Sequence, residues 1–239
     1  MSLALIPEPS PFKFNVEEAL KSGLYTSGTT GCGKTDVAMY CVDQLRKAGV
    51  YCAVFDPSQD WLRRYPASNV VTIDSISSID KIHLKSATIL DISSLTVPQT
   101  QEIVERFCQR IFEFQARTPI ENRKKIMIIF EEAHTEFPQG ILRAKRMQNA
   151  VRLLTQGRNF NIRMGMITQF AALIDKSAIR YMTQRFFGWS DEKNDLDFIS
   201  SFIGEETAQN LKYLPSGDFI YSFPRENILE KIHIEPYGR

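Results

Sequence analysis

The sequence predicts one α/β domain with a doubly wound, mostly parallel sheet that carries helices on both faces. Short apolar segments alternate with segments of helical periodicity along the 239 residues, as a parallel sheet with crossover helices requires. Residues 125–130 are the most apolar run and predict a buried central strand. Residues 28–35 form a glycine-rich loop between a predicted strand and a predicted helix, which is the third indication of this fold class.

Composition and periodicity place each predicted element in turn. Residues typical of buried strands predict strands at 24–27, 50–55, 70–73, 87–90, 125–130, 162–168, 186–189, 219–222 and 232–234. Apolar positions at helical spacing predict helices at 36–48, 98–117, 141–156, 171–176 and 195–202. No internal repeat or low-complexity linker divides the chain, so we expect an extended arm at residues 1–20 and one α/β domain at residues 21–239.

The composition is ordinary for a globular protein. Hydrophobic residues make up 43% of the chain and charged residues 24%, with a net charge of +1. No run of about 18 apolar residues occurs, and the N-terminus lacks the basic start of a signal peptide, so we expect neither a membrane span nor secretion. The four cysteines form no C-x-x-C pair, which argues against a zinc site and favours a reduced, cytoplasmic protein.

Charge is unevenly distributed along the chain. No acidic residue lies between Glu136 and Asp175, a stretch that holds Arg143, Lys145, Arg146, Arg152, Arg158 and Arg163. Residues 191–206 carry six acidic side chains and one lysine instead. Two solvated helix faces would explain this pattern, and so would a basic surface that faces a polyanion or an acidic neighbouring subunit.

A phosphate-binding loop is the strongest functional signal in the sequence. The pattern G-x-x-x-x-G-K-[ST] is matched at every fixed position by Gly28, Thr29, Thr30, Gly31, Cys32, Gly33, Lys34 and Thr35. The glycines let backbone N–H groups converge on an anion at a helix N-terminus. Lys34 can reach the β- and γ-phosphates, and the Thr35 hydroxyl can ligate Mg²⁺. The alternative is a glycine-rich turn that precedes a lysine by chance, but such a turn would not need a strand before it and a helix after it. We therefore predict that the chain binds a nucleoside triphosphate, and we expect ATP and Mg²⁺.

Two acidic residues complete the predicted site. Glu131 and Glu132 directly follow the apolar strand at 125–130, and a parallel strand beside the loop strand would bring them to the phosphates. Glu131 is expected at the Mg²⁺ position, and Glu132 is the candidate general base for the attacking water. The alternative is a strand that simply ends at the surface with two exposed acids.

The residues around these acids resemble a known family. Residues 130–134, Phe-Glu-Glu-Ala-His, are similar to the D-E-A-H segment of the FtsK–HerA superfamily of RecA-like, DNA-pumping ATPases. Further segments are similar in the same order: 55–61 to D-P-x-G-E-Y, 156–162 to G-R-K-F-G, 167–169 to A-T-Q and 214–219 to L-x-x-G-E-F. The chain departs from the family at two acids, since Glu131 replaces an aspartate and Asp60 a glutamate. Water-mediated contact between Glu131 and Mg²⁺ is therefore an alternative to direct ligation.

The resemblance implies a RecA-like ATPase domain that uses ATP to move double-stranded DNA, in a ring of usually six subunits with nucleotide between neighbours. It places Asp60 near the γ-phosphate and makes Gln169 a γ-phosphate sensor, with backbone capping as the alternative role for Gln169. It assigns Arg158 to the neighbouring subunit's nucleotide, with Arg152 as the alternative, and His134 is expected only to pack beside the acids.

The short chain looks most like the viral members of this family, which package genomes of double-stranded DNA viruses. That likeness implies a capsid or portal-like partner and a location in the host cytoplasm or the virion. Arg143, Lys145 and Arg146 follow the acidic strand and are candidates for sequence-independent DNA phosphate contacts. Two other functions stay open: a nucleotide-gated replication or assembly ATPase with slow turnover, and a P-loop kinase of small molecules.

Overall fold

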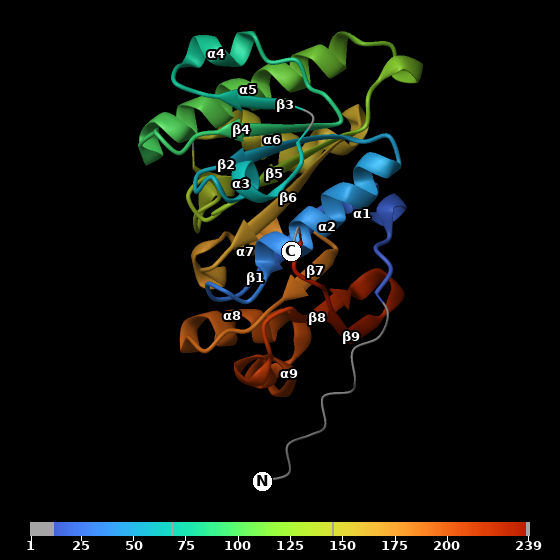
Figure 1. The fold of residues 1–239 in the computed structure, drawn as a ribbon, viewed down its shortest axis with the longest axis vertical. Coiled ribbons are helices and arrows are strands. Elements are labelled where there is room, and N and C mark those ends of the chain that lie inside the picture. The colour runs from blue at the N-terminus through green and yellow to red at the C-terminus, as the bar shows by residue number, and fades with distance from the viewer. Residues whose placement is uncertain (1–11, 68, 145, 238–239) are drawn as a thin grey trace.

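The computed structural model describes residues 12–67, 69–144 and 146–237, and it confirms the predicted fold class. These residues form a nine-stranded sheet in the order β3-β4-β2-β5-β6-β1-β7-β8-β9 (Figure 1). The strands from β3 to β7 are parallel, and β8 and β9 extend the sheet as antiparallel strands. Their bounds are β1 (Leu24–Ser27), β2 (Tyr51–Asp56), β3 (Asn69–Thr72), β4 (Ala87–Asp91), β5 (Ile126–Phe130), β6 (Ile162–Thr168), β7 (Gln184–Phe187), β8 (Asp218–Phe223) and β9 (Ile228–His233).

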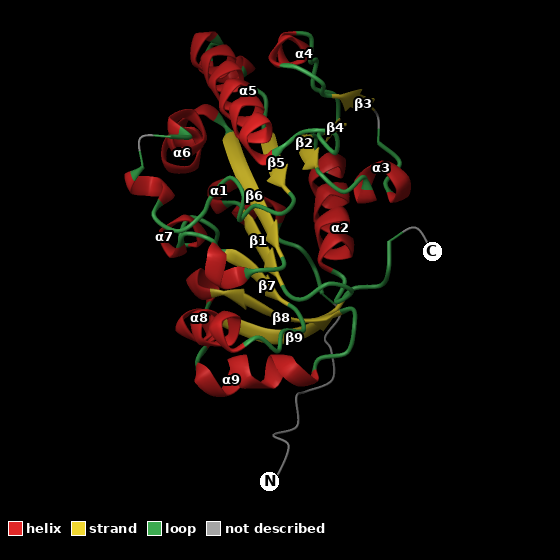
Figure 2. Cartoon of the chain, turned by 90° about the vertical axis from the view of Figure 1, so that its left-hand side faces the viewer, coloured by secondary structure: helices red, strands yellow, loops and turns green. Residues whose placement is uncertain are grey.

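Helices cover both faces of the sheet (Figure 2). One face carries α2 (Lys34–Lys47) and α3 (Asp60–Arg64), and the other carries α5 (Val97–Arg117) and α6 (Gln148–Gln156). The shorter helices are α1 (Val16–Ser22), α4 (Ile76–Asp80), α7 (Lys176–Ile179), α8 (Lys193–Ile203) and α9 (Glu205–Asn210). None of the described helices is long and apolar enough to cross a membrane.

Each face of the sheet has its own apolar core. On the α5 face, Phe55 of β2 stacks on Phe130 of β5, and Phe107 of α5 packs edge-on against Phe55, with ring centroids 5.2 Å apart in both pairs. On the opposite face, α2 buries apolar side chains that include Val37 and Leu45. Burial of one such side chain contributes about 1.5–3 kcal/mol. These contacts therefore fix the carboxyl ends of β2 and β5, which the functional site requires.

Residues 141–156 do not form the single helix that the sequence predicts. A 3-10 turn at Ile141–Arg143 comes first, and α6 begins only at Gln148. Met147 lies between them with a φ of 55°, in the left-handed region that a continuous right-handed helix excludes. The predicted helix at 171–176 is likewise divided into a 3-10 turn, Ala171–Leu173, and α7.

Part of the predicted N-terminal arm is helical. Residues 16–20 belong to α1 instead of an extended segment, because the Asn15 side chain caps the helix by accepting a hydrogen bond from the Glu18 N–H at 3.1 Å. Ala19 of this helix is buried in the core on the α2 face. Residues 1–11 of the arm lie outside the described residues.

The strand order places three functional segments side by side. The strands β5, β6 and β1 are consecutive neighbours and parallel, so their carboxyl ends lie at one edge of the sheet. The glycine loop follows β1, the two glutamates follow β5, and Gln169 follows β6. Ligands of open α/β sheets bind at this edge.

Candidate active site

The glycine loop joins β1 to α2 in a conformation that depends on its glycines. Gly31 and Gly33 have φ values of 85° and 100°, which favour glycine over residues with a side chain. Gly28 is fixed by packing as well, since a Cβ there would lie 2.7 Å from the Cys32 sulfur. Gly33 is the N-cap of α2, so the loop directs the free N–H groups and the positive end of the helix dipole at one point.

Neighbouring segments hold the loop in place. The Thr29 N–H donates to the Trp189 carbonyl at 2.8 Å, just beyond β7. The turn before β8 makes two more contacts: the Ser216 hydroxyl donates to the Gly31 carbonyl at 2.8 Å, and the Gly217 N–H donates to the Cys32 carbonyl at 3.0 Å. The loop is therefore supported from the C-terminal part of the sheet, which sequence reasoning did not anticipate.

The loop forms one wall of a cavity of about 410 Å³ at the carboxyl edge of the sheet. Most of the predicted site residues line it: Thr30, Gly31, Gly33, Lys34, Thr35, Asp60, Glu131, Glu132 and Gln169. Five lining residues were not predicted: Asp36, Ser58, Arg64, Ser216 and Pro236. Lys34 donates from Nζ to the Thr29 carbonyl at 3.1 Å, which keeps its ammonium group at the loop.

Glu131 lies directly beside Thr35. The Thr35 hydroxyl donates to Oε1 of Glu131 at 2.8 Å, while the second oxygen, Oε2, is buried without a hydrogen-bond partner in the described chain. Burial raises the pKa of Glu131 to about 8, and the nearby carboxylates of Asp56, Asp60 and Glu132 add to the effect. An orphaned carboxylate oxygen next to a hydroxyl is a fitting environment for a divalent cation, which would satisfy that oxygen and stabilise the charged carboxylate.

Glu132 has an unusual backbone conformation. Its φ of 55° lies in the left-handed region that non-glycine residues rarely adopt and that is enriched at functional sites. Gln169 donates from Nε2 to Oε1 of Glu132 at 2.8 Å, and the Thr30 hydroxyl donates to Oε1 of Gln169 at 2.7 Å. The amide of Gln169 thus connects the Glu132 carboxylate to the glycine loop. Both of these contacts are with side chains of the site.

His134 flanks Glu132 on the other side. Its Nδ1 lies 3.3 Å from Oε2 of Glu132 and 3.1 Å from the Thr168 hydroxyl, and its ring packs edge-on against Phe170. Burial lowers the pKa of His134, which favours the neutral ring at physiological pH, although Glu132 opposes the shift. The amide of Gln169 therefore holds one oxygen of Glu132, while the other lies near the imidazole and is buried without a hydrogen-bond partner in the described chain.

Asp60 lies at the rim of the cavity. It begins α3 and pairs with Arg63 one turn later at 2.5 Å, with 40% of its side chain exposed. The preceding strand end is fixed by Asp56, whose Oδ2 accepts a hydrogen bond from the Leu62 N–H at 2.9 Å. Asp60 is close enough to Glu131 to raise its pKa, and it lines the same cavity.

The predicted basic residues lie away from this cavity. Arg158 is exposed in the 3-10 turn Gly157–Phe160, directly before β6, whereas Gln169 follows the other end of the strand. Seven residues of β6 separate these ends by about 20 Å. Arg152 packs its guanidinium over the Phe112 ring, 3.7 Å from the centroid. Arg143 and Arg146 are exposed between β5 and α6, and Lys145 lies outside the described residues.

A segment near residue 236 also contributes to the cavity wall. Pro236 lines it, and Tyr237 anchors that segment by donating from its backbone N–H to Asp36 at 2.7 Å and from its hydroxyl to Asp43 at 2.7 Å. Arg64 forms an ion pair with the same Asp36. No sequence motif marks Pro236, Tyr237, Asp36 or Arg64. They are identified by the packing of Tyr237 on α2 in the structure.

The fold and the cavity together define a P-loop NTPase. No protein-family model matches the chain. It is 28% identical over 184 residues to Protein P9 of Pseudoalteromonas phage PM2, covering 74% of this chain and 75% of P9. It is 22% identical over 174 residues to the DNA double-strand break repair helicase HerA of Sulfurisphaera tokodaii, covering 70% of this chain. The matched region spans about one third (34%) of that HerA protein.

Solved structures with the same fold include two kinds of protein. The genome packaging NTPase B204 of Sulfolobus turreted icosahedral virus 2, in complex with ATP-gammaS, superposes with a TM-score of 0.65 at 14% identity, covering 90% of this chain and 96% of B204. VirB4 of Thermoanaerobacter pseudethanolicus superposes with a TM-score of 0.65 at 10% identity, covering 90% and 89%. In sequence the chain is similar to HerA helicases and phage P9, and in fold to a genome packaging NTPase and VirB4, as the sequence resemblance indicated.

Proposed function

We propose that this chain is the ATP-hydrolysing subunit of a motor that moves double-stranded DNA and packages a viral genome into a capsid. The observation that carries the proposal is the convergence of Lys34, Thr35, Glu131, Glu132 and Gln169 on one cavity at the carboxyl edge of the sheet. Likeness to HerA helicases and to a genome packaging NTPase supports DNA as the transported polymer. The chain would act as a domain at residues 21–239 behind an N-terminal arm, in the host cytoplasm or the virion.

Binding of ATP follows from the loop. The N–H groups at the start of α2 and the ammonium of Lys34 would hold the β- and γ-phosphates. No group of three or more His, Cys, Asp or Glu side chains suited to a metal ion occurs in the described residues. The Thr35 hydroxyl and the unpartnered oxygen of Glu131 would hold Mg²⁺ together with phosphate oxygens, and the ion would neutralise phosphate charge. Direct contact and contact through a water are both compatible with the Thr35–Glu131 pair.

Hydrolysis would depend on Glu132. Its carboxylate lies in the same cavity as Lys34 and can accept a proton from a water that attacks the γ-phosphate in line. Gln169 holds one of its oxygens and the other, buried beside His134, has no hydrogen-bond partner in the described chain, so that oxygen is free to accept from the water. Because Gln169 also contacts Thr30 of the loop, a γ-phosphate at the loop would change the contacts of the general base.

A ring of subunits would complete the site. Arg158 lies about 20 Å from the cavity of its own subunit, at the opposite end of β6, so it cannot reach that nucleotide. It is exposed and free to enter the site of an adjacent copy, where an arginine is worth about 10³–10⁵-fold in rate. Arg152 is less available because its guanidinium is packed on Phe112. We propose a ring of six copies with Arg158 at each junction and a capsid or portal-like protein as partner.

DNA would contact the segment between β5 and α6. Arg143 and Arg146 are exposed there, and the segment begins next to the turn that carries Glu132. Lys145 is part of the same proposal from its place in the sequence. Phosphate contacts of this kind are independent of base sequence and weaken with salt. A change at Glu132 during hydrolysis would be passed to these side chains along a short stretch of backbone.

The experiment that tests this function measures ATP turnover with and without duplex DNA, and particle size in the presence of ATP. We expect stimulation by duplex DNA and a ring-sized particle. Reversing the charge of Arg143 and Arg146 to Glu should abolish stimulation and reduce the salt slope of DNA binding by about one per lost phosphate contact. Lys81→Glu with Lys85→Glu, two exposed positions elsewhere, is the matched control. Tight ATP binding with negligible turnover would favour an assembly ATPase, and stimulation by a small acceptor alone would favour a kinase.

A further inference from the structure

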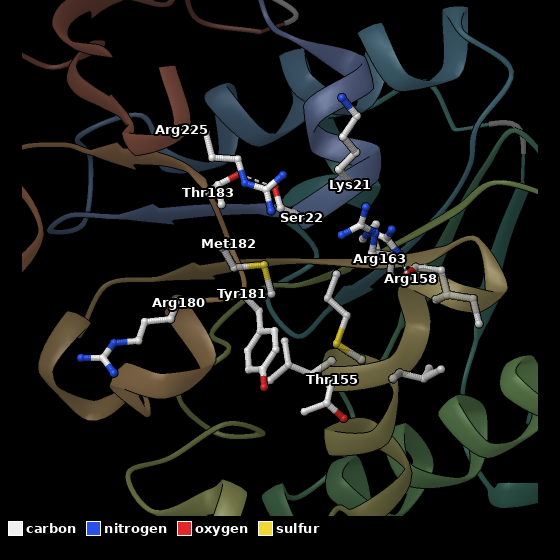
Figure 3. Close-up of a pocket in the computed structure, with 14 residues that line it drawn as sticks. Lys21, Ser22, Thr155, Arg158, Arg163, Arg180, Tyr181, Met182, Thr183 and Arg225 are labelled. Atoms are coloured by element: carbon white, nitrogen blue, oxygen red, sulfur yellow. Dashed lines mark hydrogen bonds between the residues drawn. The ribbon is translucent and has the colours of Figure 1, made fainter. Parts of the chain in front are cut away.

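A second cavity lies at the opposite edge of the sheet from the glycine loop. It has a volume of about 270 Å³ and opens between α1, the end of α6, the start of β6 and the segment that leads into β7 (Figure 3). Ile162 and Met164 of β6 line it, whereas the nucleotide cavity adjoins the far end of the same strand. The two cavities are therefore about 20 Å apart.

The lining of this second cavity is strongly basic. Its charged residues are all cationic: Lys21, Arg158, Arg163, Arg180 and Arg225. Arg158 and Arg163 lie close together, and Arg180 points away from them (Figure 3). The carboxylate of Glu18 partly neutralises the rim, since it pairs with Lys21 and lies 3.5 Å from Arg225.

Arg163 is the most unusual member of this group. It projects from a central strand with only 9% of its surface exposed, and one of its terminal nitrogens donates to the Ile162 carbonyl. Its Nε–H is buried without an acceptor, and no carboxylate of the described chain lies within ion-pair distance of Arg163 or Arg158. Burial and the neighbouring charge of Arg158 lower the pKa of Arg163 to about 10, which leaves the guanidinium charged at neutral pH.

The guanidinium group of Arg163 is buried, lacks an ion-pair partner and lies near that of Arg158. This arrangement costs free energy unless an anion binds between the two groups. A phosphate group suits the pair because its oxygens accept parallel hydrogen bonds from the planar arginine fork. The volume lies just below the range of about 300–1,000 Å³ of typical ligand pockets, so a single phosphate group fits better than a whole nucleotide.

We propose that this cavity is a second phosphate-binding site, in which Arg163 and Arg158 hold one phosphate group that belongs to a DNA backbone or to a small phosphate. The site is separate from the glycine loop and binds its ligand without ATP hydrolysis. It uses Arg158 only in a subunit whose Arg158 is not in the nucleotide site of an adjacent copy. A duplex and a free phosphate present the same chemistry to the two guanidinium groups, and competition between them identifies the source.

The test uses the full chain with Lys34→Ala, so that phosphate binding at the glycine loop is impaired. Calorimetric titration with inorganic phosphate and with pyrophosphate at low salt should show binding. Adding Arg163→Gln or Arg158→Gln should weaken it about 10-fold or more, because each removes a charged donor. Adding Arg180→Gln, whose side chain points away from the centre, should change it by less than about 2-fold.

Absence of phosphate binding to the Lys34→Ala protein, or equal weakening by all three arginine changes, would overturn the proposal. Arg158 is exposed, so its variant tests the site even if Arg163→Gln does not fold. A short DNA duplex then serves as the second probe. A duplex that displaces phosphate and binds the Arg163→Gln protein more weakly supports the site with the DNA backbone as its ligand. Displacement by ATP or pyrophosphate but not by the duplex supports the site with a small phosphate as its ligand.

Discussion

Gln169 joins Glu132 to the phosphate loop: it donates from Nε2 to Oε1 of Glu132 at 2.8 Å and accepts from the Thr30 hydroxyl at 2.7 Å. The amide thus uses both of its ends, and its orientation is fixed by one donor and one acceptor. A γ-phosphate that competes for the Thr30 hydroxyl would release the carbonyl end of Gln169 and alter its hold on Glu132. In the proposed function, this arrangement would let Gln169 sense the nucleotide.

Gln169→Ala is expected to slow ATP hydrolysis about 10- to 100-fold with little change in ATP affinity. The general base loses a hydrogen bond to its charged carboxylate, whereas the loop loses only the contact of the neutral Thr30 hydroxyl. Gln169→Glu should be slower still, since a second carboxylate would repel Glu132. Steady-state turnover and equilibrium binding of a non-hydrolysable ATP analogue separate the two effects. Thr30→Ala, which leaves the contact between Gln169 and Glu132 intact, is the matched control. If Thr30→Ala lost more turnover than Gln169→Ala, the contact with Glu132 would not be the more important one.

Glu132→Gln is expected to lower turnover about 10²–10⁴-fold while ATP stays bound, because the amide cannot accept the proton of the attacking water. The strained φ of 55° at this position persists in the variant, so the fold of the turn should not change. Single-turnover measurement with labelled ATP would show a slow chemical step and retained nucleotide. Glu121→Gln, at an exposed position remote from the site, should behave as the wild type. Retention of normal turnover by Glu132→Gln would remove Glu132 from the reaction.

Glu131 should make stability depend on pH when no Mg²⁺ is present. Its pKa of about 8 in the folded chain exceeds the value of about 4.5 of an unperturbed glutamate, so the folded state binds more protons than the unfolded state between these values. The free energy of unfolding should therefore fall as pH rises from about 5 to 8, by up to about 4 kcal/mol from this group. Urea unfolding in the presence of a chelator measures this change.

Glu131→Gln should remove this part of the pH dependence, since the amide does not titrate. Mg²⁺ with an ATP analogue should restore stability at pH 8 in the wild type and much less in the variant, because the cation stabilises the charged carboxylate. An unchanged pH profile in Glu131→Gln would assign the effect to other groups. Glu136 is the relevant comparison, since burial raises its pKa to about 7 and Glu136→Gln should affect a lower pH range.

The sequence predicted the parts of the site that follow parallel strands directly. A fixed motif gives the loop, and an apolar strand followed by two acids gives Glu131 and Glu132, because adjacent parallel strands bring their carboxyl ends together. The break of the helix before Gln148 could not be predicted, since Met147 carries no compositional sign of its left-handed φ. Ser216 and Pro236 also escaped prediction, because the strands β8 and β9 bring them to the loop from far along the chain.

The packing of Tyr237 should control ATP affinity through Pro236. The Tyr237 ring stacks on Tyr65 with centroids 5.4 Å apart, its hydroxyl bonds to Asp43, and its N–H bonds to Asp36 in the first turn of α2. These contacts hold Pro236 at the cavity wall. Tyr237→Ala removes the ring and the hydroxyl contact and should raise the KM for ATP roughly 2- to 10-fold, with kcat unchanged because no reacting group moves.

Tyr237→Phe keeps the ring stack and loses only the hydroxyl bond, so its KM should lie between those of the wild type and Tyr237→Ala. Tyr213→Ala removes a tyrosine that is 64% exposed and should leave both constants unchanged. A fall in kcat with an unchanged KM in Tyr237→Ala would mean that the segment acts on the chemical step. A raised KM in Tyr237→Ala alone would identify the C-terminal segment as a wall of the nucleotide site, because Asp36 and Arg64 stay in place in that variant.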